Sequence, residues 1–190
     1  YTTNRWGMRD KDYEKEKADG VYRIGLIGSS HTMGWGINDD ETFESITEAR
    51  LNSELAADDI TKYEILNFSV NGYSPVQKLI VLERKLIDFD LDAVILFCHR
   101  IEKQWLIKHL VSRKRANIDI PYPFIEQLVS ESGITQEMDA SLAKIYMSDY
   151  GADALRWAFS QFADTCRRNG IMPLWVLMPE EGHFALSDRD

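Results

Sequence analysis

The chain contains four short apolar segments, and the stretches between them carry apolar residues at helical spacing. The apolar segments cover residues 22–27, 64–68, 93–98 and 174–178. Short, largely apolar segments of this length are typical of strands, and the uninterrupted apolar run at 93–98 is of the kind found at the centre of a parallel sheet. No hairpin signal joins them, and parallel strands need crossover connections, usually helices. The sequence therefore predicts an α/β fold, a three-layer αβα sandwich with a parallel sheet.

The predicted helices differ in clarity along the chain. Three patterns are strong, at residues 43–55, 75–86 and 152–168. Pro75 suits the first turn of its helix, and Asn169-Gly170 suits the end of the last one. Between them, the region 101–147 is less regular, with proline breaks and three short helical pieces at 105–111, 124–129 and 142–147. We interpret His109, within the first piece, as a structural or solvated histidine.

Composition limits the domain organisation and the partners. With 190 residues and 44% hydrophobic content, the chain can bury one core. We expect an N-terminal arm at residues 1–20 and a single domain over 21–190. The net charge of −9 argues against nucleic acid or an anionic membrane as the main partner. No membrane span is expected within this chain, while its compartment and oligomeric state stay open.

No metal or cofactor is expected from the sequence. The two cysteines, Cys98 and Cys166, lie in a strand-like and a helical pattern and are interpreted as small buried residues. They form no Cys-x-x-Cys pair or zinc pattern. The small basic cluster at residues 108–115 is interpreted as a solvated helix face.

Polar residues follow three of the predicted strands. They occupy 28–32 (Gly-Ser-Ser-His-Thr), 67–74 and 98–102. Because ligands bind outside the carboxyl ends of strands in open α/β sheets, these loops are the candidate site. Ser30 is placed as a nucleophile, and the backbone amides of Ser30 and Gly72 are candidate donors to an oxyanion.

Other interpretations of the first loop are weighed against this one. Gly-Ser-Ser turns also bind phosphate through backbone amides, so a flavodoxin-like nucleotide-binding domain is an alternative. However, neither Gly-x-Gly-x-x-Gly nor Gly-Lys-Ser/Thr occurs at residues 28–36. The nucleophile elbow Gly-x-Ser-x-Gly is missed too, because Thr32 stands where glycine is required.

Two blocks together resemble the SGNH/GDSL hydrolase superfamily. The first is the apolar run followed by residues 28–32, with Ser30 at the nucleophile position, and the second is residues 67–75. The resemblance implies a flavodoxin-like SGNH fold that uses no cofactor. It also implies serine-dependent hydrolysis or transfer of an acyl ester. The substrate would be a small-molecule or glycan ester, with O-acetyl groups on carbohydrate among the options.

The sequence departs from the family pattern at residues near the expected reaction. Ser29 replaces the usual aspartate, and Ile101 lies near the position of an asparagine that donates to the oxyanion. His99 is a possible substitute donor, or a histidine that simply ends its strand. These departures favour a competing hypothesis, a catalytically impaired SGNH-like module that binds a glycan, an acyl group or a partner protein.

The catalytic base of the family is a histidine in an Asp-x-x-His motif, which this sequence lacks. In one interpretation Asp190 begins that motif, and the domain is C-terminally incomplete. In the other, His183 is the base, although it follows the last strand very closely.

Overall fold

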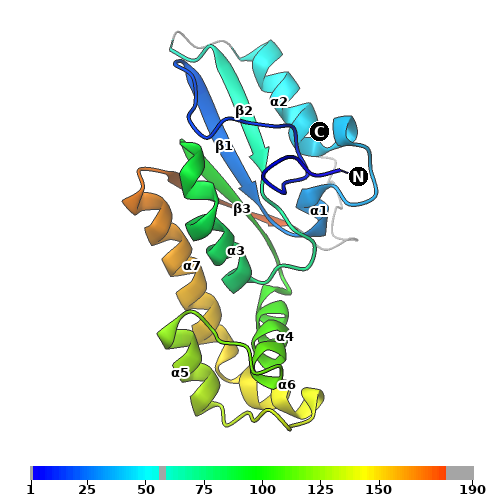
Figure 1. Cartoon of the computed structure of the whole chain (residues 1–190), viewed down its shortest axis with the longest axis vertical. Helices are drawn as coiled ribbons and strands as arrows, with labels where there is room; N and C mark the ends of the chain where they lie inside the picture. Colours follow the sequence, from blue (N-terminus) through cyan, green and yellow to red (C-terminus); the bar gives the residue numbers. More distant parts are fainter. Residues whose placement is uncertain (1, 56–58, 179–190) are drawn as a thin grey trace, which may run out of the picture.

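The computed structural model describes residues 2–55 and 59–178, and it contains a parallel sheet of four strands in the order β2-β1-β3-β4 (Figure 1). All three strand pairs are parallel. The α/β fold with a parallel sheet that the sequence predicted is therefore confirmed. The strands are β1 (Val21–Ile27), β2 (Lys62–Asn67), β3 (Ala93–His99) and β4 (Met172–Met178).

The strong helical patterns all form helices. They are α2 (Phe43–Glu54), α3 (Pro75–Arg84) and α7 (Gly151–Arg168). Three short elements were not predicted, namely α1 (Ser30–Met33) and the 3₁₀ turns η1 (Asp39–Glu41) and η2 (Leu86–Phe89). In α1 a single helical turn directly follows a strand, and a window of several turns does not detect so short an element.

The main core lies between one face of the sheet and helices α3 and α7. Buried side chains from β1, β2 and β3 meet apolar residues of both helices there, for example Ile27, Leu66, Leu96, Leu79 and Phe162. The opposite face carries α1 and α2, and Phe43 of α2 packs against Phe97 of β3 with ring centroids 5.3 Å apart. Among the described residues β4 is an edge strand, and its side chains remain partly exposed.

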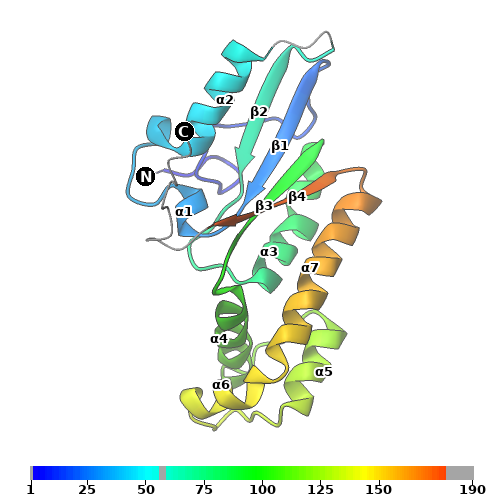
Figure 2. The same ribbon diagram turned by 180° about the vertical axis from the view of Figure 1, so that it is seen from behind.

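A helical extension projects beyond the carboxyl end of β3. It consists of α4 (Glu102–Arg115), α5 (Pro123–Glu131), α6 (Ala140–Ser148) and the adjoining part of α7, and both views show it extending away from the sheet (Figures 1 and 2). Its own apolar cluster includes Leu106, Leu110, Ile125 and Met147. The three short helical pieces of the sequence prediction are therefore real, but α4 is twice as long as expected and forms a wall beside the sheet edge.

Residues 2–20, the predicted arm, form no helix or strand, yet they pack on the domain. Met8 and Tyr13 are buried in the main core, and the Tyr13 hydroxyl donates to the carbonyl of Ile65 at 2.9 Å. Over the described part of the chain, no helix has the length and apolar content needed to cross a bilayer.

Candidate active site

Ser30 lies at the carboxyl end of β1, as the first residue of α1. The chain can turn into this helix immediately after the strand because Gly28, which has no side chain, leaves room for the side chain of Thr32. A Cβ atom on Gly28 would lie 2.1 Å from the Thr32 hydroxyl oxygen, closer than such atoms can come. Ser29, fully buried, is the N-terminal cap residue, which leaves Ser30 partly exposed at the edge of the sheet.

Gly72 lies in the loop that follows β2, the neighbour of β1 in the sheet. Its turn is closed by a hydrogen bond from the Tyr73 N–H to the Val70 carbonyl at 3.3 Å. Gly72 has φ of +74°, in the left-handed region that favours glycine. The loop then enters α3 through Ser74, whose hydroxyl accepts from the Gln77 N–H, so the end of the loop is anchored to the helix.

Ser30 and Gly72 line one cavity of about 390 Å³. The structure thus brings together the two residues that the sequence singled out from different strand ends. Asn71 and Gln77 lie beside Gly72, and the facing wall belongs to α4. That wall consists of Trp105, Lys108, His109 and Ser112.

Sequence reasoning missed the α4 wall, although a signal for it was present. Residues 105, 108, 109 and 112 are spaced so that they share one face of a helix. His109 therefore lines the candidate site, whereas the sequence indicated a structural or solvated residue. Burial, together with the nearby Arg113, lowers the pKa of His109 to about 4, so its imidazole is neutral near pH 7. Its buried Nε2 atom has no hydrogen-bond partner among the described residues.

The backbone amides of Ser30 and Gly72 are available to a ligand. Within residues 2–55 and 59–178, neither N–H donates to another group. Backbone amides that make no other hydrogen bond can donate to an oxyanion in acyl transfer. The geometry therefore suits a serine attacking an ester carbonyl at this edge of the sheet.

No hydrogen bond joins a described histidine to the Ser30 hydroxyl. His99, at the end of β3, is hydrogen-bonded instead to its neighbour, with 2.9 Å between His99 Nε2 and Ser29 Oγ. Its ring lies between those of His31 and Trp105, each with centroids 5.2 Å away. Burial lowers the pKa of His99, so the ring is neutral near pH 7. The two sequence candidates for the base, His183 and Asp190, lie outside the described residues.

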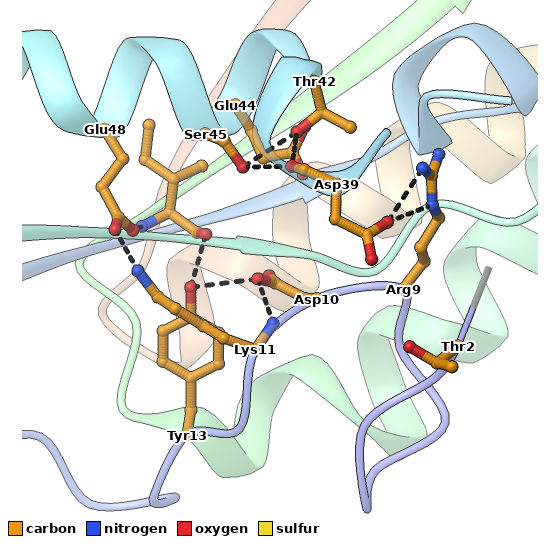
Figure 3. A pocket seen from close by; sticks show the side chains of 11 residues that line it. Thr2, Arg9, Asp10, Lys11, Tyr13, Asp39, Thr42, Glu44, Ser45 and Glu48 are labelled. Carbon is orange, nitrogen blue, oxygen red and sulfur yellow. Dashed lines mark hydrogen bonds and ion pairs between the residues drawn. The ribbon is translucent and has the colours of Figure 1, made fainter. Parts of the chain in front are cut away.

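Arg9 and Asn67 bind backbone carbonyl groups of residues 32–37, the segment that follows Ser30. Arg9 of the arm donates to the carbonyls of Met33 (3.0 Å), Gly34 and Ile37. It also pairs with Asp39 at 2.9 Å, as Figure 3 shows. Asn67, the last residue of β2, donates through its side chain to the carbonyl of Thr32 at 2.8 Å.

A second cavity of about 350 Å³ lies between the arm, β2 and the start of α2 (Figure 3). Two of its carboxylates are paired, Asp39 with Arg9 and Glu48 with Lys11. Asp10 is different, because burial raises its pKa to about 7 despite hydrogen bonds from backbone N–H groups. Burial also raises the pKa of the nearby Glu44. No set of three or more His, Cys, Asp or Glu residues suited to a metal ion occurs in the described ranges.

Comparisons with known proteins reveal likeness in structure only. No protein-family model matches the sequence, and no curated protein matches it. The chain is similar to the crystal structure of TesA, with 12% identity over 83% of this chain and a TM-score of 0.47. It spans 62% of the length of TesA.

Two esterases of known structure are also similar to this chain. AlinE4, described as a SGNH-hydrolase family esterase, shares 15% identity over 83% of this chain and 77% of its own, with a TM-score of 0.36. The psychrotrophic esterase EstA from Pseudoalteromonas sp. shares 13% identity over 81% of this chain and 76% of its own, also with a TM-score of 0.36.

Proposed function

We propose that this chain hydrolyses or transfers an acyl ester by a serine-dependent reaction, with Ser30 as the nucleophile. The observation that carries the proposal is that Ser30 and Gly72, from two neighbouring strand ends, line one cavity and keep their backbone amides free. The hydroxyl attacks the ester carbonyl, and the negative charge that develops on the carbonyl oxygen is held by the two amides.

The hydroxyl must lose its proton during the attack, and no described histidine is hydrogen-bonded to Ser30 Oγ. The base is therefore sought in His183 or in a histidine of an Asp-x-x-His motif that begins at Asp190. In either case it takes the proton from Ser30 Oγ and returns it to the leaving alcohol.

The substrate is a small ester with a polar leaving group, such as an O-acetyl group on a carbohydrate. Most side chains on the cavity wall are polar, namely Asn71, Gln77, Lys108, His109 and Ser112. Hydroxyl and amide groups of this kind recognise sugar hydroxyls rather than long acyl chains. Trp105 adds an aromatic face against which a sugar ring can pack.

A binding module without turnover is the second candidate, and one observation favours it. His99, which lies against the nucleophile turn, is hydrogen-bonded to Ser29 rather than to Ser30. Such a module would bind a glycan, an acyl group or a partner protein in the same cavity.

Ester hydrolysis by the full-length protein separates the two candidates. We expect release of 4-nitrophenol from 4-nitrophenyl acetate, and loss of that release in Ser30→Ala. Ser69→Ala is the matched control, because the Ser69 hydroxyl is buried and has no partner among the described residues. Saturable binding of acetylated sugars with no Ser30-dependent hydrolysis would support the binding module instead.

A further inference from the structure

A continuous chain of contacts connects a buried ion pair to the residue before the nucleophile. Lys78 of α3 and Glu102 of α4 form the ion pair, with 2.6 Å between Lys78 Nζ and Glu102 Oε1. The same carboxylate oxygen accepts the backbone N–H of His99 at 3.1 Å. His99 in turn bonds Ser29, the residue next to Ser30, through its ring.

The Lys78–Glu102 ion pair is buried, and its contribution is to fix geometry rather than to add stability. The Lys78 and Glu102 side chains are 1% and 3% exposed. Burying two charges costs about as much as their attraction returns, so such a pair is a poor source of stability. The pair instead fixes the position of the end of β3. Lys78 donates to the carbonyl of Phe97 at 3.1 Å, and Glu102 accepts the backbone N–H of His99.

The position of His99 is restricted further by its neighbours. Its ring contacts those of His31 and Trp105, and its backbone is held by Glu102. The charged and titratable groups that influence its pKa are Glu102, His31 and Lys78. A neutral imidazole fixed in this way presents Nε2 to the buried Ser29 hydroxyl in one geometry.

We propose that Ser29 and His99 are positioning residues, and that their hydrogen bond holds the Ser30 turn in register with β3. Neither residue contacts the ester. The Lys78–Glu102 pair anchors His99, and His99 anchors the cap residue of α1. This inference rests on the proposed function for its effect on rate, but its effect on the turn can be measured independently.

The test compares Ser29→Ala, His99→Ala and the double variant with the Ser69→Ala control. A small displacement of a catalytic group costs up to a hundredfold, so we expect labelling by a fluorophosphonate to slow roughly ten- to a hundredfold in each single variant. The KM for 4-nitrophenyl acetate should stay within about twofold of the wild-type value, because no group that binds the ester is removed. The double variant should be no slower than the slower single variant, since both remove one interaction. His99→Gln places an amide where Nε2 lies and should recover much of the rate.

Amide hydrogen exchange gives the readout that does not need activity. The Met33 and Trp35 N–H groups donate to the carbonyls of Ser29 and Ser30 at 2.9 and 3.0 Å. Their exchange should accelerate in Ser29→Ala and His99→Ala, and not in Ser69→Ala. Unchanged exchange, or losses that multiply in the double variant, would overturn the inference. A wild-type protein that neither labels nor hydrolyses would refute the proposed function, while the exchange data would still decide the role of this pair.

Discussion

Replacement of Arg9 by alanine should destabilise the protein through the segment that carries Ser30. The Arg9 side chain is 4% exposed and donates to three carbonyl groups, those of Met33, Gly34 and Ile37. Each of the three hydrogen bonds lost costs about 1 kcal/mol. The Met33 and Ile37 carbonyls lose the donor that Arg9 supplies, while the Gly34 carbonyl keeps the Ile37 N–H at 3.4 Å. The ion pair with Asp39, whose side chain is 64% exposed, adds at most about 0.5 kcal/mol. We therefore expect a loss of about 3 kcal/mol in the free energy of unfolding.

Urea unfolding followed by tryptophan fluorescence measures this loss. Arg9→Lys should lose about 2 kcal/mol, because one ammonium group cannot reach all three carbonyls. Arg50→Ala is the control. The Arg50 side chain is 69% exposed, and among the described residues its ion pair is with Glu54 on the same helix, so its removal should cost less than about 0.5 kcal/mol. A loss below about 1 kcal/mol in Arg9→Ala would refute the reasoning, because the arm would then not hold the segment.

Three further predictions concern charge and backbone geometry. Burial raises the pKa of Glu44 and raises the pKa of Asp10 to about 7. The folded state therefore binds these two protons more tightly than the unfolded state does. The free energy of unfolding should fall as pH rises from 4 to 8. Glu44→Gln should therefore raise Tm by a few degrees at pH 8 and leave it unchanged at pH 4; an equal shift at both pH values would contradict this. Gly72→Ala should lower the free energy of unfolding in urea by about 1 kcal/mol, because alanine is strained at φ of +74°. It should also slow the labelling of Ser30. If neither quantity changes, the left-handed conformation of Gly72 does not matter for stability or for the site. Lys108→Glu should lower the ratio of kcat/KM for an ester that bears a carboxylate to kcat/KM for a neutral acetate. Lys114→Glu, outside this cavity, should leave that ratio unchanged. The same ratio in wild type and Lys108→Glu would show that Lys108 does not contact the substrate.

The alternation of strands and helices could be predicted because it depends on local patterns. The run at 93–98 forms β3, and the proline at 75 and the Asn-Gly pair at 169–170 mark helix ends where the structure has them. The carboxyl ends of parallel strands meet at one edge, so placing Ser30 near Gly72 followed from topology alone.

The contacts that hold the candidate site could not be predicted in the same way. The bond between Ser29 and His99 joins residues 70 positions apart, and the Arg9 contacts span 24 to 30 positions. Such pairs depend on strand register and on the path of the arm, which no local pattern encodes. The α4 wall could have been found from the spacing of 105, 108, 109 and 112, had the helix been assigned its full length.

The nucleophile itself is the most direct test of the account. The full-length protein should be treated with a fluorophosphonate, digested, and the modified peptide identified by mass spectrometry. We expect one modified residue, Ser30, with labelling lost in Ser30→Ala and kept in Ser69→Ala. Modification of another serine, or no modification of a folded protein, would contradict it.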